Sequence, residues 1–346
     1  MPTISANSLK LYTEKILIAA GAPEPAAELI SDSLVSANLR GVDSHGVQLL
    51  PLYVQQIEQG NLDPRARGHV VSSEGACLLF DAECAFGQVA AAQACDHAVR
   101  LADEFALGFV TVRNSNHFGA AAYWGSRIEA AGKIGIVFCN ASPLVAPWQG
   151  KEPVMGTNPI CVAVPGPWLL DMATSAVAYN KIYDAAMRNA TSIPEGWALN
   201  AAGASASKPA EALKGSVMPL GGHVAGFKGS GLAAAVEILC SVLSGGPIGR
   251  EVGSMRNGGR MNVSQSFLAI DIKRFLPVEE FRHRVEHFVS MMKSTSPAEG
   301  HEEVLVAGDP QWRAEQQRSV DGIPIPDATW KLMTRTAEKL CISLAA

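Results

Sequence analysis

The chain has 346 residues, of which 48% are apolar and 18% are charged, and its formal net charge is −5. This composition is typical of a globular protein with large cores and excludes an extensively disordered chain. Lysine and arginine are dispersed, so nothing favours a nucleic acid or an anionic membrane surface as partner. The seven cysteines lie far apart without a Cys-x-x-Cys pair, so neither a zinc site nor a dense disulfide framework is expected.

The N-terminal segment lacks a basic stretch followed by an apolar run, so no signal peptide is expected. No uninterrupted apolar stretch reaches about 18 residues, so no transmembrane helix is expected either. Together these features favour a soluble cytoplasmic protein.

The first sixty residues are predicted to form an α-helical lobe. Helices are expected from Ser8 to about Ala20, from near Pro25, and from Val47 to Gln59. We assign residues 1–68 to this lobe, joined by a C-terminal helix at about 310–346. Residues 69–309 then form a central α/β region for cofactor and substrate.

The central region begins with alternating strands and helices. Strands are predicted at Cys77–Phe80, Phe109–Val112 and Ile134–Cys139, with helices at Gln88–Phe105 and Ala120–Ala131 between them. Apolar runs then follow without intervening helices, at Ile160–Val164 and Trp168–Asp171. This change indicates antiparallel strands, so the fold is predicted to be α/β with a mixed sheet.

The remaining pattern predicts further helices and strands, with one exposed loop between them. Residues 201–214 are small, polar and interrupted by proline, which is typical of a loop. The other predicted elements are a helix at Gly231–Ser244, a strand at Phe267–Ile272, a helix at Val278–Met292, a strand at Val304–Val306 and a helix at Asp327–Leu340.

Two polar clusters precede predicted helices. The first, Arg40-Gly41-Val42-Asp43-Ser44-His45-Gly46, places a serine and a histidine at a helix N-terminus, where free N–H groups and the positive dipole end attract anions. The second, Asn114-Ser115-Asn116-His117-Phe118-Gly119, repeats this arrangement. The pair suggests proton transfer beside a bound anion. Alternatively, each cluster is a capping turn with a buried histidine.

No stretch matches the common nucleotide-binding motifs, because neither the G-x-G-x-x-G fingerprint nor the P-loop pattern occurs. The glycine-rich segment from Gly221 to Gly231 still suits an anion, since it leads into a helix and contains Lys228. A flexible turn before a core helix explains it equally well. Asp171, at a strand end, is either a turn residue or the carboxylate that orients a catalytic histidine.

His283 and His287 are spaced like a metal-binding pair on a helix, but arginines lie beside them and no HExxH glutamate is present. A solvated helix face explains this spacing better. No metal site is therefore expected.

Taken in order, seven segments resemble the malate/L-lactate dehydrogenase family of the second type, which includes ureidoglycolate dehydrogenase and Δ1-piperideine-2-carboxylate reductase. They span almost the whole chain: Arg40 to Gly46, Asn114 to Gly119, Gly156 to Pro159, Leu170 to Ser175, Ile193 to Ala198, Pro219 to Gly222 with Phe227 to Gly229, and Leu243 to Gly249.

The resemblance implies a homodimeric oxidoreductase that transfers a hydride between NAD or NADP and a small 2-oxo or 2-hydroxy acid, of the malate, lactate or ureidoglycolate kind. The alternative substrate is a cyclic imine. It also implies a non-Rossmann cofactor fold with a central, largely antiparallel sheet, in agreement with the missing fingerprint. A non-catalytic binding protein on the same fold is a further alternative.

The resemblance also implies roles for individual residues. His45 matches the proton donor, with Ser44 and Asp171 assisting, while His117 matches a histidine with an acid/base role in some relatives. Substrate positions match Leu49, Tyr53 and Thr157. Cofactor positions match His117, Asp171, Met172, Ala173, Thr174, Ser175, Lys228, Gly229, Gly308 and Asp309.

Three departures from the family pattern bear on specificity. Leu49 stands where the family has an arginine that grips the substrate carboxylate, and a leucine cannot form that pair. The family's Pro-Gly-Glu turn reads Ala307-Gly308-Asp309, which leaves the preference between NAD and NADP open. The usual Thr-x-Asp-Pro loop reads Ala206-Ser207-Lys208-Pro209.

Overall fold

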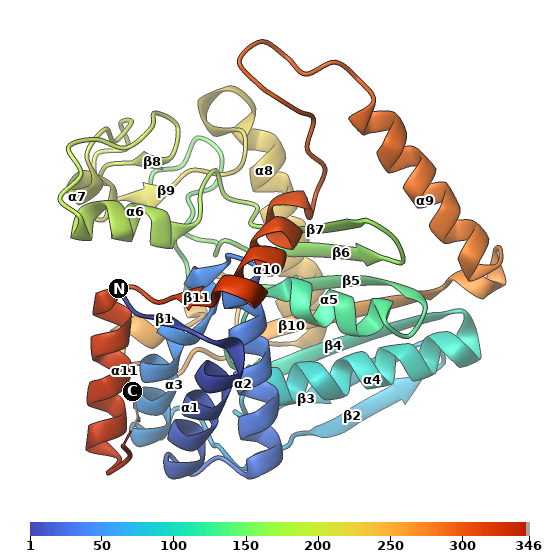
Figure 1. Ribbon diagram of the computed structural model, residues 1–346, viewed down its shortest axis with the longest axis horizontal. Helices are drawn as coiled ribbons and strands as arrows, with labels where there is room; N and C mark the ends of the chain where they lie inside the picture. The colour runs from blue at the N-terminus through green and yellow to red at the C-terminus, as the bar shows by residue number, and fades with distance from the viewer. Residues whose placement is uncertain (344–346) are drawn as a thin grey trace.

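A seven-stranded mixed sheet forms the centre of the protein (Figure 1). The computed structural model describes residues 1–343. Only the neighbours β3 and β4 run parallel, and every other neighbouring pair in this sheet is antiparallel. The predicted α/β fold with a largely antiparallel sheet is confirmed. In spatial order the strands are β2 (His69–Glu74), β3 (Cys77–Asp81), β4 (Leu107–Ser115), β10 (Val263–Asp271), β5 (Lys133–Cys139), β6 (Ile160–Val164) and β7 (Trp168–Met172).

Two helices cover one face of this sheet, α4 (Gly87–Phe105) and α5 (Ala121–Glu129). The alanine-rich α4 lies very close to β4, because a Cβ added at Gly108 would be 2.1 Å from the carbonyl oxygen of Ala98. Side chains of β10 alternate between the two faces, as a strand requires. Phe267 packs into the core under α4 and α5, whereas the Ser266 hydroxyl donates to the Leu239 carbonyl on the other side.

The opposite face of the sheet contacts a helix with an irregular course. It begins as α8 (Gly222–Glu237) and continues as a π-helical segment, Ile238–Val242. Its start is nine residues earlier than the predicted Gly231, and Ala225 is non-helical, so the glycine-rich segment is itself largely helical. By length and composition, Gly222–Val242 is the one described helix able to cross a membrane, with a mean hydropathy of 1.3. Core helices of soluble proteins meet the same criterion, so this is weak evidence for a membrane span.

A second apolar cluster joins the two ends of the chain. It contains side chains from the N-terminal helices, such as Leu9 and Ile30, together with Ile323 and Met333 from the C-terminal segment. Figure 1 shows the C-terminal helix beside the N-terminal ones. The elements are β1 (Thr3–Ile4), α1 (Ala6–Ala19), α2 (Glu24–Leu39), α3 (Leu50–Glu58), α10 (Asp309–Asp321), β11 (Ile323–Pro324) and α11 (Asp327–Lys339).

The division into residues 1–68 with 310–346 and residues 69–309 stays a prediction, and residues 344–346 lie outside the described part. The structure adds a small cluster around Val145 and Ile182. Its elements are α6 (Tyr179–Met187), β8 (Ala198–Leu199), α7 (Pro209–Ala212) and β9 (Ser216–Val217). The predicted loop at 201–214 is therefore wrong in part, because Pro209 begins a short helix there.

The last difference between the predicted and observed elements lies just before α10. The predicted strand Val304–Val306 is wrong, because these residues form an irregular segment after α9 (Val278–Lys293). The Val306 N–H is bonded to the Asp309 carboxylate instead of a strand partner. His283 and His287 lie on α9 with exposed side chains, as a solvated face requires.

Candidate active site

The Ser44–His45–Gly46 segment is a tight double turn. Two short 3-10 helices, Asp43–His45 and Val47–Leu49, precede α3, which starts only at Leu50. The prediction that Ser44 and His45 sit at the N-terminus of a helix beginning at Val47 is thus corrected. Gly46 is required there, because an added Cβ would be 2.2 Å from Asn38 Oδ1.

A polar clamp holds this turn against the end of α2. Asn38 Oδ1 accepts from the Val47 N–H at 2.8 Å, and Asn38 Nδ2 donates to Asp43 Oδ1 at 2.6 Å. Arg318, from α10, binds both carboxylate oxygens of Asp43, at 2.7 and 3.1 Å, and also donates to the Asn38 carbonyl. Sequence reasoning missed this clamp, since Arg318 is 275 residues from Asp43.

His45 and His117 lie together although they are far apart in sequence. Their rings are stacked, with centroids 5.6 Å apart and planes 24° apart. The Ser44 hydroxyl lies 3.0 Å from His45 Nδ1. Burial lowers the pKa of His45 to about 4, so this imidazole is neutral at neutral pH.

His117 is fixed by side chains from two helices and by a backbone group of its own turn. Its Nδ1 accepts from the Gly119 N–H at 3.1 Å, and the Tyr53 hydroxyl from α3 lies 2.8 Å from the same nitrogen. Gln88 Nε2, from α4, donates to the Tyr53 hydroxyl at 3.0 Å. Gln88 is another residue that sequence reasoning missed. A fully buried glutamine in an alanine-rich helix is the signal that could have revealed it.

The hydrogen bond of the Asp171 carboxylate is with a backbone N–H instead of with His45. Its Oδ2 accepts from the Ala122 N–H, at the start of α5, at 2.8 Å. Dense surrounding protein raises the pKa of Asp171 to about 6, although solvent reaches the side chain. The Ala122 hydrogen bond and the nearby Arg40 oppose this rise. The proposed relay from Asp171 to His45 stays a prediction.

The segment after Asp171 lies beside the glycine-rich helix. The Leu220 N–H donates to the Thr174 carbonyl at 2.9 Å, and Ser175 forms a β-bridge with Pro219. An added Cβ at Gly229 would lie 2.3 Å from the Leu220 backbone nitrogen. Through Pro219 and Leu220, the structure therefore brings together two of the predicted cofactor segments, the one that includes Met172 and Ala173 and the one that includes Gly229, next to the exposed Lys228.

The Gly308–Asp309 turn lies against β7, because the Leu169 N–H donates to the Ala307 carbonyl. Gly308 has a φ of 102°, which favours glycine. The Asp309 carboxylate accepts from Lys293 Nζ at 2.7 Å and from the Val306 N–H at 2.9 Å. These hydrogen bonds and the charge of Lys293 outweigh burial and lower the pKa of Asp309. Its side chain thus already has a structural role.

The three predicted substrate residues differ in their surroundings. Tyr53 contacts His117 through its hydroxyl, as described above. Leu49 is 4% exposed and packs in the apolar cluster of the helical lobe, so a contact with substrate stays a prediction. Thr157 is half-buried, and its carbonyl accepts from the backbone and hydroxyl of Thr174.

Glu237 is a buried carboxylate that accepts three hydrogen bonds, one of them from Asn158, the neighbour of Thr157. Its carboxylate accepts from Asn158 Nδ2 at 2.9 Å, from Asn140 Nδ2 at 3.2 Å and from the Gly249 N–H at 2.8 Å. Asn158 Oδ1 in turn accepts from the Ala141 N–H. These bonds tie α8 to the turn that carries Thr157.

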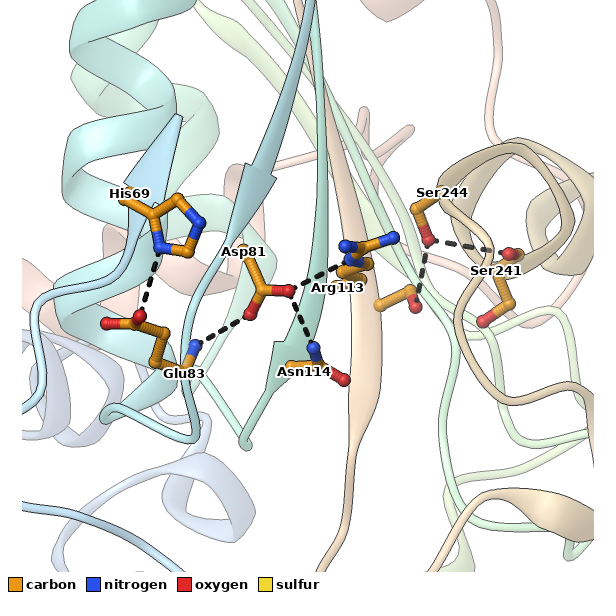
Figure 2. A network of polar contacts seen from close by, with 8 residues as sticks. His69, Asp81, Glu83, Arg113, Asn114, Ser241 and Ser244 are labelled. Carbon is orange, nitrogen blue, oxygen red and sulfur yellow. Dashed lines mark hydrogen bonds and ion pairs between the residues drawn. The ribbon is translucent and has the colours of Figure 1, made fainter. Parts of the chain in front are cut away.

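A further polar network supports the segment before His117 (Figure 2). Asp81 accepts from Arg113 Nε at 2.9 Å and from Asn114 Nδ2 at 2.7 Å. It also accepts from the Glu83 N–H, which fixes the following turn. The Asn116 amide then donates to the two carbonyls that end this turn. The network thus anchors the residue next to His117.

The residues around β7 fit a nicotinamide dinucleotide. Gly229 packs directly against the Leu220 backbone, which holds the segment after Asp171 beside α8, and Gly308 forms a left-handed turn against the Trp312 ring. Lys228 supplies an exposed cation for a phosphate. The helix resumes after the kink at Ala225, so Lys228 lies in the first turn of the resumed segment, where backbone N–H groups favour anions.

Comparison with known proteins agrees with this geometry. Residues 4–334 match the family model described as malate/L-lactate dehydrogenase. The chain belongs to the malate/L-lactate dehydrogenase family. It is therefore a dehydrogenase acting on hydroxy and oxo acids, and the predicted membership and enzyme class are confirmed.

Individual members of the malate/L-lactate dehydrogenase family resemble the chain over nearly its full length. A malate dehydrogenase of Pyrococcus abyssi is 37% identical over 93% of this chain and 90% of its own. The structure of sulfolactate dehydrogenase from Methanocaldococcus jannaschii is 33% identical, with a TM-score of 0.92 over 99% and 98% of the two chains. That of δ1-piperideine-2-carboxylate reductase from Pseudomonas syringae is 25% identical, with a TM-score of 0.83 over 97% and 100%.

Proposed function

We propose that this enzyme transfers a hydride between NAD or NADP and a small 2-oxo or 2-hydroxy acid, with the proton handled by the paired imidazoles of His45 and His117. The stacked pair, beside the segments that fit a dinucleotide, is the observation that carries the proposal. In the reduction direction an imidazolium of the pair gives its proton to the substrate oxygen and becomes neutral, and in the reverse direction a neutral imidazole takes up the alcohol proton.

When bound, the cofactor supplies or accepts the hydride at carbon. The protein must then supply a proton to the substrate oxygen, or remove one in the reverse direction. His117 is held by Tyr53 and Gly119 through Nδ1, and we assign the contact with the substrate oxygen to its other nitrogen, Nε2. His45, with a pKa of about 4, adds no positive charge to the pair at neutral pH.

For the cofactor we propose the residues that lie around the end of β7. Asp171, Met172, Ala173, Thr174 and Ser175 form one wall, and Lys228 and Gly229 form another. Gly308 and His117 complete the set through their backbone and ring. Asp309 contributes by shaping the turn, since its carboxylate is already bonded to Lys293.

For the substrate we propose a small acid of the malate, lactate or ureidoglycolate kind. The alternative is a cyclic imine carboxylate, whose apolar ring could pack against Leu49 if that side chain lines the pocket. In that alternative, the proton goes to the imine nitrogen. Tyr53 and Thr157 are the proposed neighbours of the substrate in both cases.

We further propose a homodimer, because α8 and the π-helical segment that continues it carry several exposed apolar side chains. Val224, Phe227, Ile238 and Val242 are each more than half exposed in the single chain. Large exposed apolar surfaces mark interaction sites. The cytoplasmic location stays a prediction.

A cofactor-resolved screen tests the proposed function. The enzyme is incubated with NADH or NADPH and each of pyruvate, oxaloacetate and a cyclic imino acid, and with NAD or NADP and sulfolactate or ureidoglycolate. We expect turnover on at least one substrate class. Cofactor binding without turnover on any substrate would indicate the non-catalytic alternative and contradict the proposal.

A further inference from the structure

We propose that Gln88 is a positioning residue which, acting through Tyr53, reinforces the His117 tautomer with the proton on Nε2 and holds the ring in place. The inference rests on hydrogen bonds that run in one direction from α4 to the imidazole. The assignment of the His117 tautomer does not depend on the proposed function, whereas the expected effect of Gln88 on kcat rests on it.

The direction is set by a backbone group. The Gly119 N–H lies 3.1 Å from His117 Nδ1 and can only donate. Nδ1 must therefore be the unprotonated nitrogen that accepts. A neutral imidazole has one protonated nitrogen, so its proton lies on Nε2.

Tyr53 continues the chain. Its hydroxyl lies 2.8 Å from the same Nδ1 and must donate to it, because that nitrogen carries no hydrogen. The hydroxyl oxygen is then free to accept, and Gln88 Nε2 donates to it at 3.0 Å. Tyr53 stays protonated because burial raises its pKa far above the usual value.

Gln88 matters both for its position and because it donates its hydrogen bond to Tyr53. Its side chain is 0% exposed, and among the described residues its Oε1 has no hydrogen-bond partner. Donation to Tyr53 is therefore the one hydrogen bond the carboxamide makes. A residue of equal size that accepts at this place would attract the tyrosine proton and weaken the hydrogen bond from Tyr53 to His117 Nδ1.

Nitrogen-15 NMR of histidine-labelled enzyme tests the assignment directly. The probe is the full-length protein without substrate, near neutral pH, with His117 assigned by comparison with the His117→Gln spectrum. We expect a pyridine-type signal for Nδ1 and a pyrrole-type signal for Nε2. A pyrrole-type Nδ1 would overturn the assignment, even if the dehydrogenase activity were established.

Gln88→Glu tests the positioning role, with Gln93→Glu on the same helix as matched control. Gln93 bonds to the carbonyls of Arg67 and Val89, away from the histidine pair. In Gln88→Glu the carboxylate should accept from Tyr53, so the His117 Nδ1 signal should move while Gln93→Glu leaves it in place. We also expect kcat to fall about 10- to 100-fold, the cost typical of a misplaced catalytic group, with little change in the KM for cofactor.

Because a buried glutamate can impair folding, Gln88→Met provides a second, uncharged variant that also lacks the donor. It should move the Nδ1 signal in a folded protein, as judged by an unchanged circular dichroism spectrum. An unmoved signal in folded Gln88→Met would overturn the role of Gln88. A moved signal with an unchanged kcat would overturn the claim that Gln88 contributes to turnover.

Discussion

At the scale of single residues, the two stacked imidazoles differ in how their surroundings hold them. His45 meets a hydroxyl at Nδ1, which can donate or accept, and burial alone lowers its pKa. His117 meets a backbone N–H that can only donate. The directional contacts therefore favour His117 as the group that presents an N–H to substrate, with His45 as its neutral neighbour.

The first prediction compares the two histidines. His117→Ala should lower kcat by about 10²–10⁴, the usual contribution of a general acid, while the Kd of the cofactor changes little. Steady-state kinetics and cofactor fluorescence titration measure the two quantities. His45→Ala is the paired variant. If it alone shows the large loss, His45 is the proton donor, as first expected from sequence, and this assignment to His117 is wrong.

The second prediction concerns Asp171 and pH. Its pKa in the folded protein, about 6, is above the unfolded value of 3.8, so the folded state holds this proton more tightly. Its contribution favours folding below about pH 4 and is lost as the pH rises through about 6. Asp171→Asn lacks this titration. Its Tm relative to wild type should therefore be higher at pH 7 than at pH 4, whereas an equal difference at both would contradict the raised pKa.

Sequence motifs indicated the residues with unusual chemistry but not their partners. Ser44, His45 and His117 were found because serine and histidine next to glycine form recognisable turns. Gln88 and Arg318 were not, because each acts across the interface between separate elements. Such contacts depend on tertiary packing, which local patterns do not encode.

At the scale of elements, α10 reaches back from the C-terminal region to hold the turn before His45. Arg318 and Asp43 form a bidentate ion pair, and both side chains are partly shielded from solvent. Charge-assisted pairs of this geometry are stronger than single contacts and orient what they bind. The C-terminal segment therefore contributes to the site without touching the substrate.

The third prediction tests this clamp. Arg318→Met should lower kcat/KM about tenfold by loosening the turn that carries His45, a change of ~1.4 kcal/mol. Lys339→Met is the matched control, since it breaks the exposed Lys339–Glu58 pair on α11. Surface pairs of that kind contribute about 0–1 kcal/mol and should leave kcat/KM unchanged. Equal effects of the two variants would contradict the clamp.

The fourth prediction follows from the burial of Leu49. Leu49→Ala should lower the free energy of unfolding by about 2–5 kcal/mol, because it leaves a cavity in the apolar cluster of the lobe. Urea denaturation measures this change, with Leu332→Ala as control, since Leu332 is 51% exposed. A loss below about 0.5 kcal/mol, the usual range of a surface change, would show that Leu49 lies at the open pocket instead of in the core.

Periodic segments were the most predictable elements. The strand Ile160–Val164 was placed with its correct bounds, and the helices α4, α9 and α11 within two residues of theirs. The start of α8 was missed because its glycines are typical of a loop, although the close contact with Leu220 requires a glycine at Gly229. The false strand at 304–306 was an apolar run whose backbone is bonded to a side chain, which no periodicity reveals.

At the scale of the whole molecule, the exposed apolar side chains of α8 and of the π-helical segment Ile238–Val242 give the fifth prediction. The wild-type enzyme should have the mass of a dimer in light scattering. Val242→Asp should shift it toward the monomer, because a charge would be buried at the interface. Val320→Asp is the control, since Val320 is 86% exposed on α10. A monomeric wild-type protein, or dissociation in the control alone, would contradict the role of this helical surface in the dimer.

The most direct test of the central claim follows the hydride itself. Reduced cofactor carrying deuterium at the transferred position is incubated with the enzyme and the best substrate of the screen, in ordinary water. Mass spectrometry of the product should show one deuterium on the former carbonyl or imine carbon, with the proton on oxygen or nitrogen drawn from water. A reduced product without deuterium at that carbon would contradict direct hydride transfer at this site.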